Sequence, residues 1–147
     1  MKKVLPFAIA ALLVPSVALA KGPNPNKGPH GNHGKANVLY VLRGTLSAYS
    51  AYDSSTSTNG SITIDVKGAN RHGRALKGMS LTFTGEVAST TRVALPDGVT
   101  VIADGDRGLV KIRAPREPRD TSGSDLAAAL TALSVRQIVD QGAASSG

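Results

Sequence analysis

The sequence has no cysteine and no tryptophan, and only three tyrosines and two phenylalanines occur among its 147 residues. The lack of cysteine excludes the disulfide bonds on which many small extracellular domains depend. A domain of this size therefore has to be held together by a packed core and by backbone hydrogen bonds. Because aromatic side chains are so few, we expect that core to consist of Val, Ile, Leu and Ala.

A long apolar run occurs only at the amino terminus. Lys2 and Lys3 precede an apolar stretch from residue 4 to residue 14, and small residues lead to Ala20. This is the pattern of a secretory signal peptide, so we predict that residues 1–20 are removed. The run is shorter than the ~20 residues of a membrane-spanning helix, which disfavours a permanent anchor. We expect a protein that is secreted, extracellular or associated with the cell envelope. It should have no transmembrane segment after processing, and its formal charge should fall from +7 to +5.

Residues 21–36 consist mainly of Gly, Pro, Asn, Lys and His. Such a composition cannot form a core, so this segment is predicted to be a disordered linker. His30 and His33 lie three residues apart in it, but a closed metal site needs four ligands on a rigid frame. We therefore expect no metal site and no cofactor.

Alternating apolar and polar residues predict three strands in the first half of the remaining chain. Polar loops at residues 50–60 and 68–78 separate the strands, and Gly44 indicates a bend or bulge in the first one. The side chains expected to face the core are Val38, Tyr40, Leu42, Leu46 and Ala48 in the first strand, Ile62, Ile64 and Val66 in the second, and Met79, Leu81, Phe83, Gly85 and Val87 in the third.

The second half of the remaining chain is predicted to form shorter strands and one helix. Residues 99–102 and 109–113 are expected to be strands, with Asp-Gly turns before each of them. Ser124 is expected to cap a short helix over residues 125–130, and the alternation of Leu133, Val135, Gln137 and Val139 suits a closing strand. One helix over residues 125–141 stays open as an alternative to this helix and strand.

These elements predict an all-β fold, a small five- to six-stranded, OB-like, partly open barrel with one short helix. We place this domain at residues 37–140, followed by a flexible tail at residues 141–147.

Several segments together resemble a known family. They are LRGTL at residues 42–46, GSITIDV at 60–66, STTRV at 89–93, DGDRGLVKI at 104–112 and ALSVR at 132–136. Over residues 38–139 the chain resembles a bacterial, largely actinobacterial, family of small secreted or envelope-exposed domains of unknown function with an OB-like barrel. Gly108 after Arg107 and the long Ser/Thr loop depart from the pattern of that family. The resemblance implies a fold and a location, and it supplies no catalytic residues.

Basic residues gather in two segments, the loop at residues 68–78 and the stretch at residues 107–119. The candidate binding residues are Arg71, His72, Arg74 and Lys77 in the first, and Arg107, Lys111 and Arg113 in the second, which continues to Arg116 and Arg119. Clustered positive charge attracts anionic polymers over a long range. The alternative is that these cations form an ordinary solvated surface that aids solubility.

The sequence gives little support for a catalytic site. A Ser-His-Asp triad needs a histidine held in the fold, and only His72 qualifies, beside two arginines that disfavour its charged form. Asp97, Asp104 and Asp106 border Asp-Gly turns, where turn formation accounts for them. No Gly-x-Ser-x-Gly motif occurs. We expect no catalytic residues, and a small secreted hydrolase built on these four side chains is the rival hypothesis.

We therefore expect a monomeric, non-catalytic binding module whose partner is an anionic wall polymer or another protein. Nucleic acid is not the expected partner, because few exposed rings are available for base stacking and export removes such ligands. A third hypothesis is a structural or protein-interaction module in which an exposed strand edge accepts an additional strand.

Overall fold

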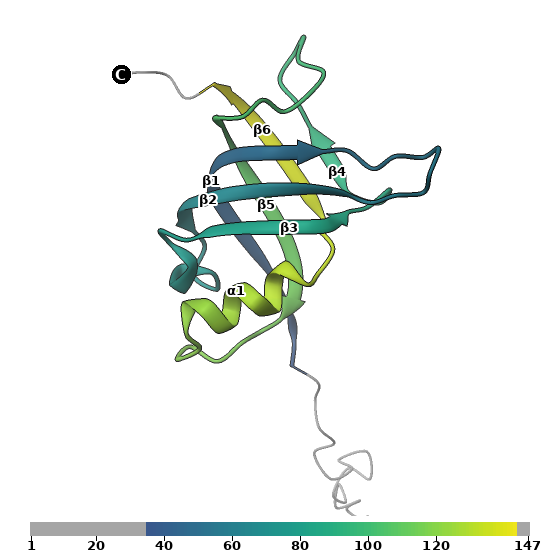
Figure 1. Cartoon of the computed structure of the whole chain (residues 1–147). Coiled ribbons are helices and arrows are strands. Elements are labelled where there is room, and N and C mark those ends of the chain that lie inside the picture. The colour runs from purple at the N-terminus through teal and green to yellow at the C-terminus, as the bar shows by residue number, and fades with distance from the viewer. Residues whose placement is uncertain (1–34, 144–147) are drawn as a thin grey trace, which may run out of the picture. The chain divides into compact units, whose positions relative to one another are not determined.

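The computed structural model describes residues 35–143. The predicted signal peptide, the linker up to residue 34 with His30 and His33, and residues 144–147 of the predicted tail lie outside the described residues. The strands are β1 (Asn37–Ser50), β2 (Gly60–Ala69), β3 (Ser80–Val87), β4 (Arg92–Ala94), β5 (Asp106–Pro115) and β6 (Gln137–Ala143). The helical elements are the single 3-10 turn η1 (Arg74–Leu76) and the helix α1 (Gly123–Thr131), as Figure 1 shows.

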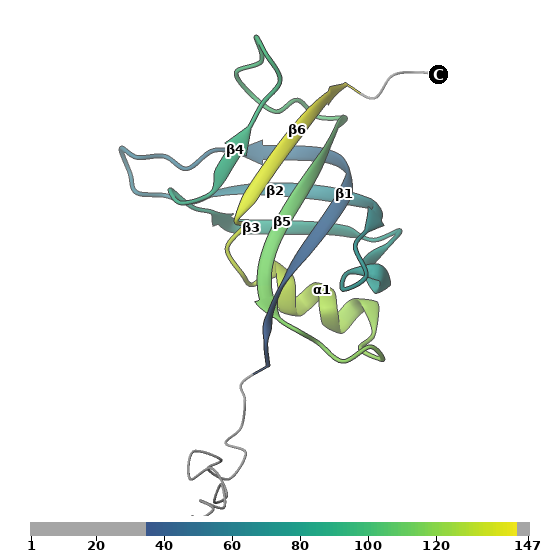
Figure 2. The same ribbon diagram turned by 180° about the vertical axis from the view of Figure 1, so that it is seen from behind.

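The strands form one curled six-stranded sheet in the order β3-β2-β1-β5-β6-β4. Neighbouring strands are antiparallel except β4, which runs parallel to β6. Figures 1 and 2 show the two halves of the sheet crossing over each other, with α1 below the opening between them. The predicted all-β, partly open barrel with one short helix is confirmed.

The bend in β1 is what curls the sheet. Its first half pairs with β5, from Asn37 opposite Pro115 to Thr45 opposite Arg107, while its second half pairs with β2. The register with β2 shifts between Arg43 and Gly44. A side chain at position 44 would place its Cβ 1.8 Å from the carbonyl oxygen of Asp65. The predicted bend at Gly44 is therefore confirmed, and its cause is a close approach of two backbones.

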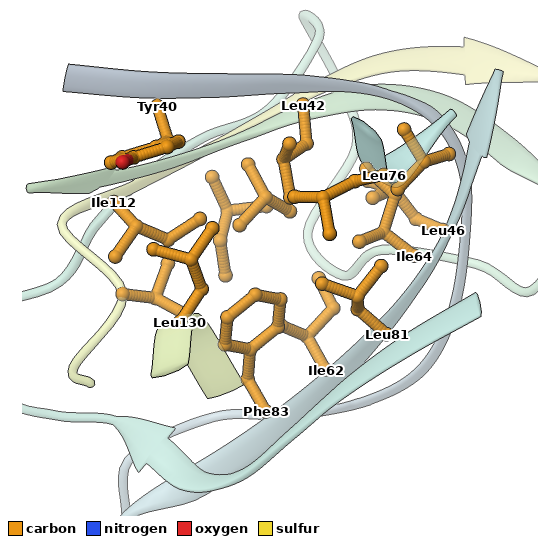
Figure 3. Close-up of a cluster of buried hydrophobic side chains, with 14 of the residues drawn as sticks. Tyr40, Leu42, Leu46, Ile62, Ile64, Leu76, Leu81, Phe83, Ile112 and Leu130 are labelled. Atoms are coloured by element: carbon orange, nitrogen blue, oxygen red, sulfur yellow. The ribbon is translucent and has the colours of Figure 1, made fainter. Parts of the chain in front are cut away.

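The core fills the space inside the curl. Its side chains are aliphatic apart from Tyr40 and Phe83, as the composition predicts. Figure 3 labels the largest of them, which are Tyr40, Leu42, Leu46, Ile62, Ile64, Leu76, Leu81, Phe83, Ile112 and Leu130. Leu76 belongs to η1 and lies in the middle of a loop that the sequence indicates only as polar, so this loop is anchored in the core.

Two expectations about strands are wrong. Residues 99–102 form no strand, and Val99 and Val101 are exposed while only Ile102 is buried. Ala48 does not face the core, because β1 is irregular between Ser47 and Ser50 and Ala48 is exposed at a φ of 49°.

The carboxyl-terminal segment forms a helix followed by a strand, so the single-helix alternative is wrong. Ser122 rather than Ser124 caps α1, since its side chain accepts a hydrogen bond from the backbone N–H of Asp125. In β6 the buried side chains are Ile138 and Asp140, opposite in phase to the predicted alternation through Gln137 and Val139. β6 continues to Ala143, so the first three residues of the predicted tail belong to the sheet.

No helix among residues 35–143 has the length and apolar character needed to cross a membrane.

Candidate anion-binding site

A cleft of about 450 Å³ lies where the loop after β2 meets the segment between β5 and α1. The loop contributes Arg71, His72 and Arg74, and the segment contributes Arg116 and Arg119. We call this set of five residues the arginine cleft. Ala75, Pro118 and Leu126 supply apolar lining, so the charged groups surround a partly apolar floor.

Asn70 fixes the loop that carries the first three residues. Its backbone N–H donates to the carbonyl oxygen of Val41 at 3.0 Å, and its side-chain amide donates to that of Leu39 at 2.7 Å. The N–H of Gly73 closes the turn by donating to the backbone oxygen of Asn70 at 3.0 Å. The loop is thus attached to β1 at one end and to the core through Leu76 at the other.

The second segment is attached to the same strand. The backbone N–H of Arg116 donates to the carbonyl oxygen of Ala36 at 3.0 Å. The N–H of Glu117 donates to the hydroxyl oxygen of Tyr40 at 3.1 Å. Because both segments bind the first half of β1, residues separated by more than forty positions in the sequence face one cleft.

The arginines of the cleft have no carboxylate partner. The only ion pair among residues 35–143 joins Lys35 to Glu117, at 2.9 Å. No Asp or Glu occurs before Asp53 or after Asp140, so the side chains outside the described residues cannot supply one either. Glu117 lines the cleft, but its charge is already paired with that of Lys35. The cleft therefore holds four arginines, none of which has a carboxylate within ion-pair distance.

The surroundings of His72 favour its neutral form. The Nε–H of Arg71 donates to Nε2 of His72 at 3.2 Å, a hydrogen bond that only the unprotonated Nε2 can accept. Desolvation, followed by the positive charges of Arg71 and Arg116, lowers the pKa of His72 below its ordinary value. The ring also meets that of Tyr40 edge-on, with 6.0 Å between the ring centroids.

The structure brings together only part of the predicted binding set. Arg71, His72 and Arg74 line the cleft, whereas Lys77, Arg107, Lys111 and Arg113 do not. Lys111 donates instead to the side-chain oxygen of Gln137 at 3.0 Å. Arg116 and Arg119, at the end of the second basic segment, line the cleft in their place. The sequence shows these two arginines only as members of the second basic segment. It does not indicate which members of that segment lie near Arg71.

Two of the three carboxylates considered for catalysis accept hydrogen bonds from the backbone. Asp104 Oδ1 accepts from the N–H of Ala48 at 2.8 Å, and Asp106 Oδ2 accepts from that of Ala103 at 3.0 Å. Among the described residues, no group of three or more His, Asp or Glu side chains is arranged to hold a metal ion.

Comparison of the chain with protein-family models, curated proteins and solved structures finds no match. The function therefore has to be inferred from the cleft and its charges.

Proposed function

We propose that this protein is a non-catalytic module of the cell envelope that binds an anionic polymer in the arginine cleft. The observation that carries the proposal is the convergence of Arg71, Arg74, Arg116 and Arg119 on one cleft without a carboxylate partner. A cleft lined by positive charge concentrates the electrostatic field and so attracts anions.

The chemistry of the guanidinium group indicates the kind of anion. A planar guanidinium can donate two parallel hydrogen bonds to the oxygens of a phosphate or a carboxylate. The apolar floor formed by Ala75, Pro118 and Leu126 can accommodate the uncharged carbon part of a polymer unit. We therefore expect a ligand that alternates anionic groups with uncharged carbon segments, such as a phosphate-bearing wall polymer.

The proposed location rests on the signal-peptide pattern of residues 1–20 and on the resemblance to secreted and envelope-exposed domains. A polymer of the cell wall is the abundant polyanion that a protein in that location would meet.

Co-sedimentation with purified cell-wall sacculi tests the proposal. The chain lacking residues 1–20 is mixed with sacculi at low and at physiological salt, and the pelleted fraction is measured. We expect pelleting that weakens as salt rises, because counterions screen the contact. The variant Arg71→Glu, Arg74→Glu, Arg116→Glu should stay in the supernatant.

A matched control changes the same amount of charge away from the cleft. Arg43→Glu, Lys67→Glu, Arg107→Glu substitutes three exposed cations of the sheet and should pellet nearly as the parent chain does. Equal loss in both triple variants would mean that net charge, not the cleft, drives the contact. Equal retention in both would overturn the proposal.

A further inference from the structure

The molecule has a second cationic cleft, of about 350 Å³, that the sequence did not indicate. It lies between the turn that joins β3 to β4 and the connection from α1 to β6. Its polar lining consists of Thr90, Arg92, Ser134, Arg136 and Gln137. We call it the second cleft.

The backbone under the second cleft is firmly bonded. The hydroxyl of Thr91 donates to the carbonyl oxygen of Val135 at 2.6 Å and accepts from the N–H of Ala88 at 3.0 Å. The N–H of Arg92 donates to the carbonyl oxygen of Arg136 at 3.1 Å. The backbones of the two arginines are thus directly bonded, Arg92 at the start of β4 and Arg136 just before β6, and both side chains line the cleft.

The charge balance of this cleft is positive. Arg92 and Arg136 are exposed, and Lys111 reaches the rim through its hydrogen bond to Gln137. Glu86 is the acidic neighbour, and it accepts a hydrogen bond from the hydroxyl of Ser134 at 3.1 Å. Within residues 35–143 it forms no ion pair with either arginine. The cleft therefore offers guanidinium, hydroxyl and amide donors, the set that recognises an oxyanion.

We propose that the second cleft binds another anionic group of the same polymer, so that the domain holds the polymer at two points. This inference rests on the proposed function of the arginine cleft. The two clefts lie at opposite ends of α1, since Leu126 in its first turn lines the arginine cleft and Ser134, just beyond its last turn, lines the second cleft. In Figure 1 the first turn of α1 lies toward the loop between β2 and β3, and its other end leads to β6.

Because the two clefts lie at the two ends of α1, the length of this helix sets the scale of the separation that a ligand has to bridge. Nine residues at about 1.5 Å each correspond to about 13 Å. A monomeric anion or a very short chain can occupy one cleft only, whereas a longer polymer can occupy both. When one polymer molecule occupies both clefts, its affinity exceeds that for either cleft alone, because the second binding step is intramolecular.

Inorganic polyphosphate chains of defined length test this inference. Affinity and stoichiometry are measured by calorimetry for the chain lacking residues 1–20. The variants are Arg71→Gln, Arg74→Gln in the arginine cleft, Arg92→Gln, Arg136→Gln in the second cleft, and Arg43→Gln, Arg107→Gln as a control of equal charge. Chains of two or three phosphates represent the ligand that cannot span the clefts.

We expect each molecule of the parent protein and of the control variant to bind two short polyphosphates. Each molecule of a cleft variant should bind one. For chains long enough to span both clefts, affinity of the parent should exceed that of either cleft variant by at least about tenfold. If Arg92→Gln, Arg136→Gln binds both lengths as the control does, the second cleft is not a site and this inference is overturned. If only Arg71→Gln, Arg74→Gln behaves as the control, the proposed function of the arginine cleft fails while the second cleft stands.

Discussion

The hydroxyl group of Tyr40 lies between two backbone groups of the segment that carries Arg116, donating to the carbonyl oxygen of Pro115 at 3.2 Å and accepting from the N–H of Glu117 at 3.1 Å. The ring of Tyr40 is buried in the core. One side chain therefore connects the interior of the barrel to one wall of the arginine cleft.

Replacing Tyr40 by Phe removes this connection while leaving the ring in place. We expect the free energy of unfolding to fall by about 1–2 kcal/mol, because the N–H of Glu117 loses its acceptor. We also expect affinity for polyphosphate to fall several-fold, since Arg116 is no longer held toward Arg71. Chemical denaturation and calorimetry measure the two effects. A loss of stability with unchanged affinity would show that the segment is positioned by other contacts.

The titration of His72 reports whether the cleft is filled. In the free protein we expect its pKa to lie below the usual 6.5, because burial and the charges of Arg71 and Arg116 disfavour the imidazolium. Stability should therefore fall as the pH drops below 6.5, since the unfolded chain takes up this proton first. An anion in the cleft favours the imidazolium and should raise the pKa.

Proton NMR of the imidazole signals measures the pKa of His72 with and without phosphate. The titration covers roughly pH 4.5 to 8, the range in which histidine changes its charge. A free-state pKa at or above the usual value, or one that phosphate leaves unchanged, contradicts the assignment of His72 to an anion site.

Gly44→Ala should be strongly destabilising. The added Cβ would lie 1.8 Å from the carbonyl oxygen of Asp65, and only a separation of β1 from β2 can relieve that overlap. We expect a loss of at least about 3 kcal/mol in the free energy of unfolding, measured by denaturant titration. Gly68→Ala is the matched control, since its Cβ meets no atom within 4 Å, and it should change stability by less than about 0.5 kcal/mol. Similar losses at the two positions would contradict the steric account.

Ser122→Ala should destabilise α1 by about 1 kcal/mol. The Ser122 hydroxyl accepts from the N–H of Asp125 at 3.1 Å and donates to its carboxylate at 2.7 Å, and both bonds are lost. Ser124→Ala removes only one exposed hydrogen bond between two serines and should cost less than about 0.5 kcal/mol. Thermal unfolding of the two variants decides between these positions, and a larger effect at Ser124 would restore the cap that the sequence predicts.

The strands with one face in the core were predictable from the sequence. In β2 and β3 every second residue is apolar, and Ile62, Ile64 and Phe83 are buried as that pattern requires. The sequence VTVI at residues 99–102 has the same local character but no strand to pair with. β4, in contrast, has three exposed residues and exists because it pairs with β6. Strand propensity alone cannot distinguish these cases, since pairing is a tertiary interaction.

The carboxyl-terminal strand escaped prediction for a related reason. Ile138 and Val139 are adjacent and both apolar, so the sequence permits either phase. The contacts with β5 select the phase that buries Ile138.

The positive charge of the candidate site was predictable from the sequence, but the residues that form the site were not. Both basic segments stand out in the sequence, yet the distance between Arg71 and Arg116 along the chain gives no sign that they meet. Their meeting depends on Asn70 and Tyr40, which bind the two segments to β1. Arg107 begins β5 at the opposite end from Arg116, so a single strand separates two members of one basic cluster.

β6 comes last in sequence among the elements of residues 35–143, yet it lies inside the sheet between β5 and β4. Until residues 137–143 have left the ribosome, β4 has no partner and one side of β5 has unpaired backbone groups. The complete six-stranded sheet can therefore form only after residues 137–143 have been synthesised.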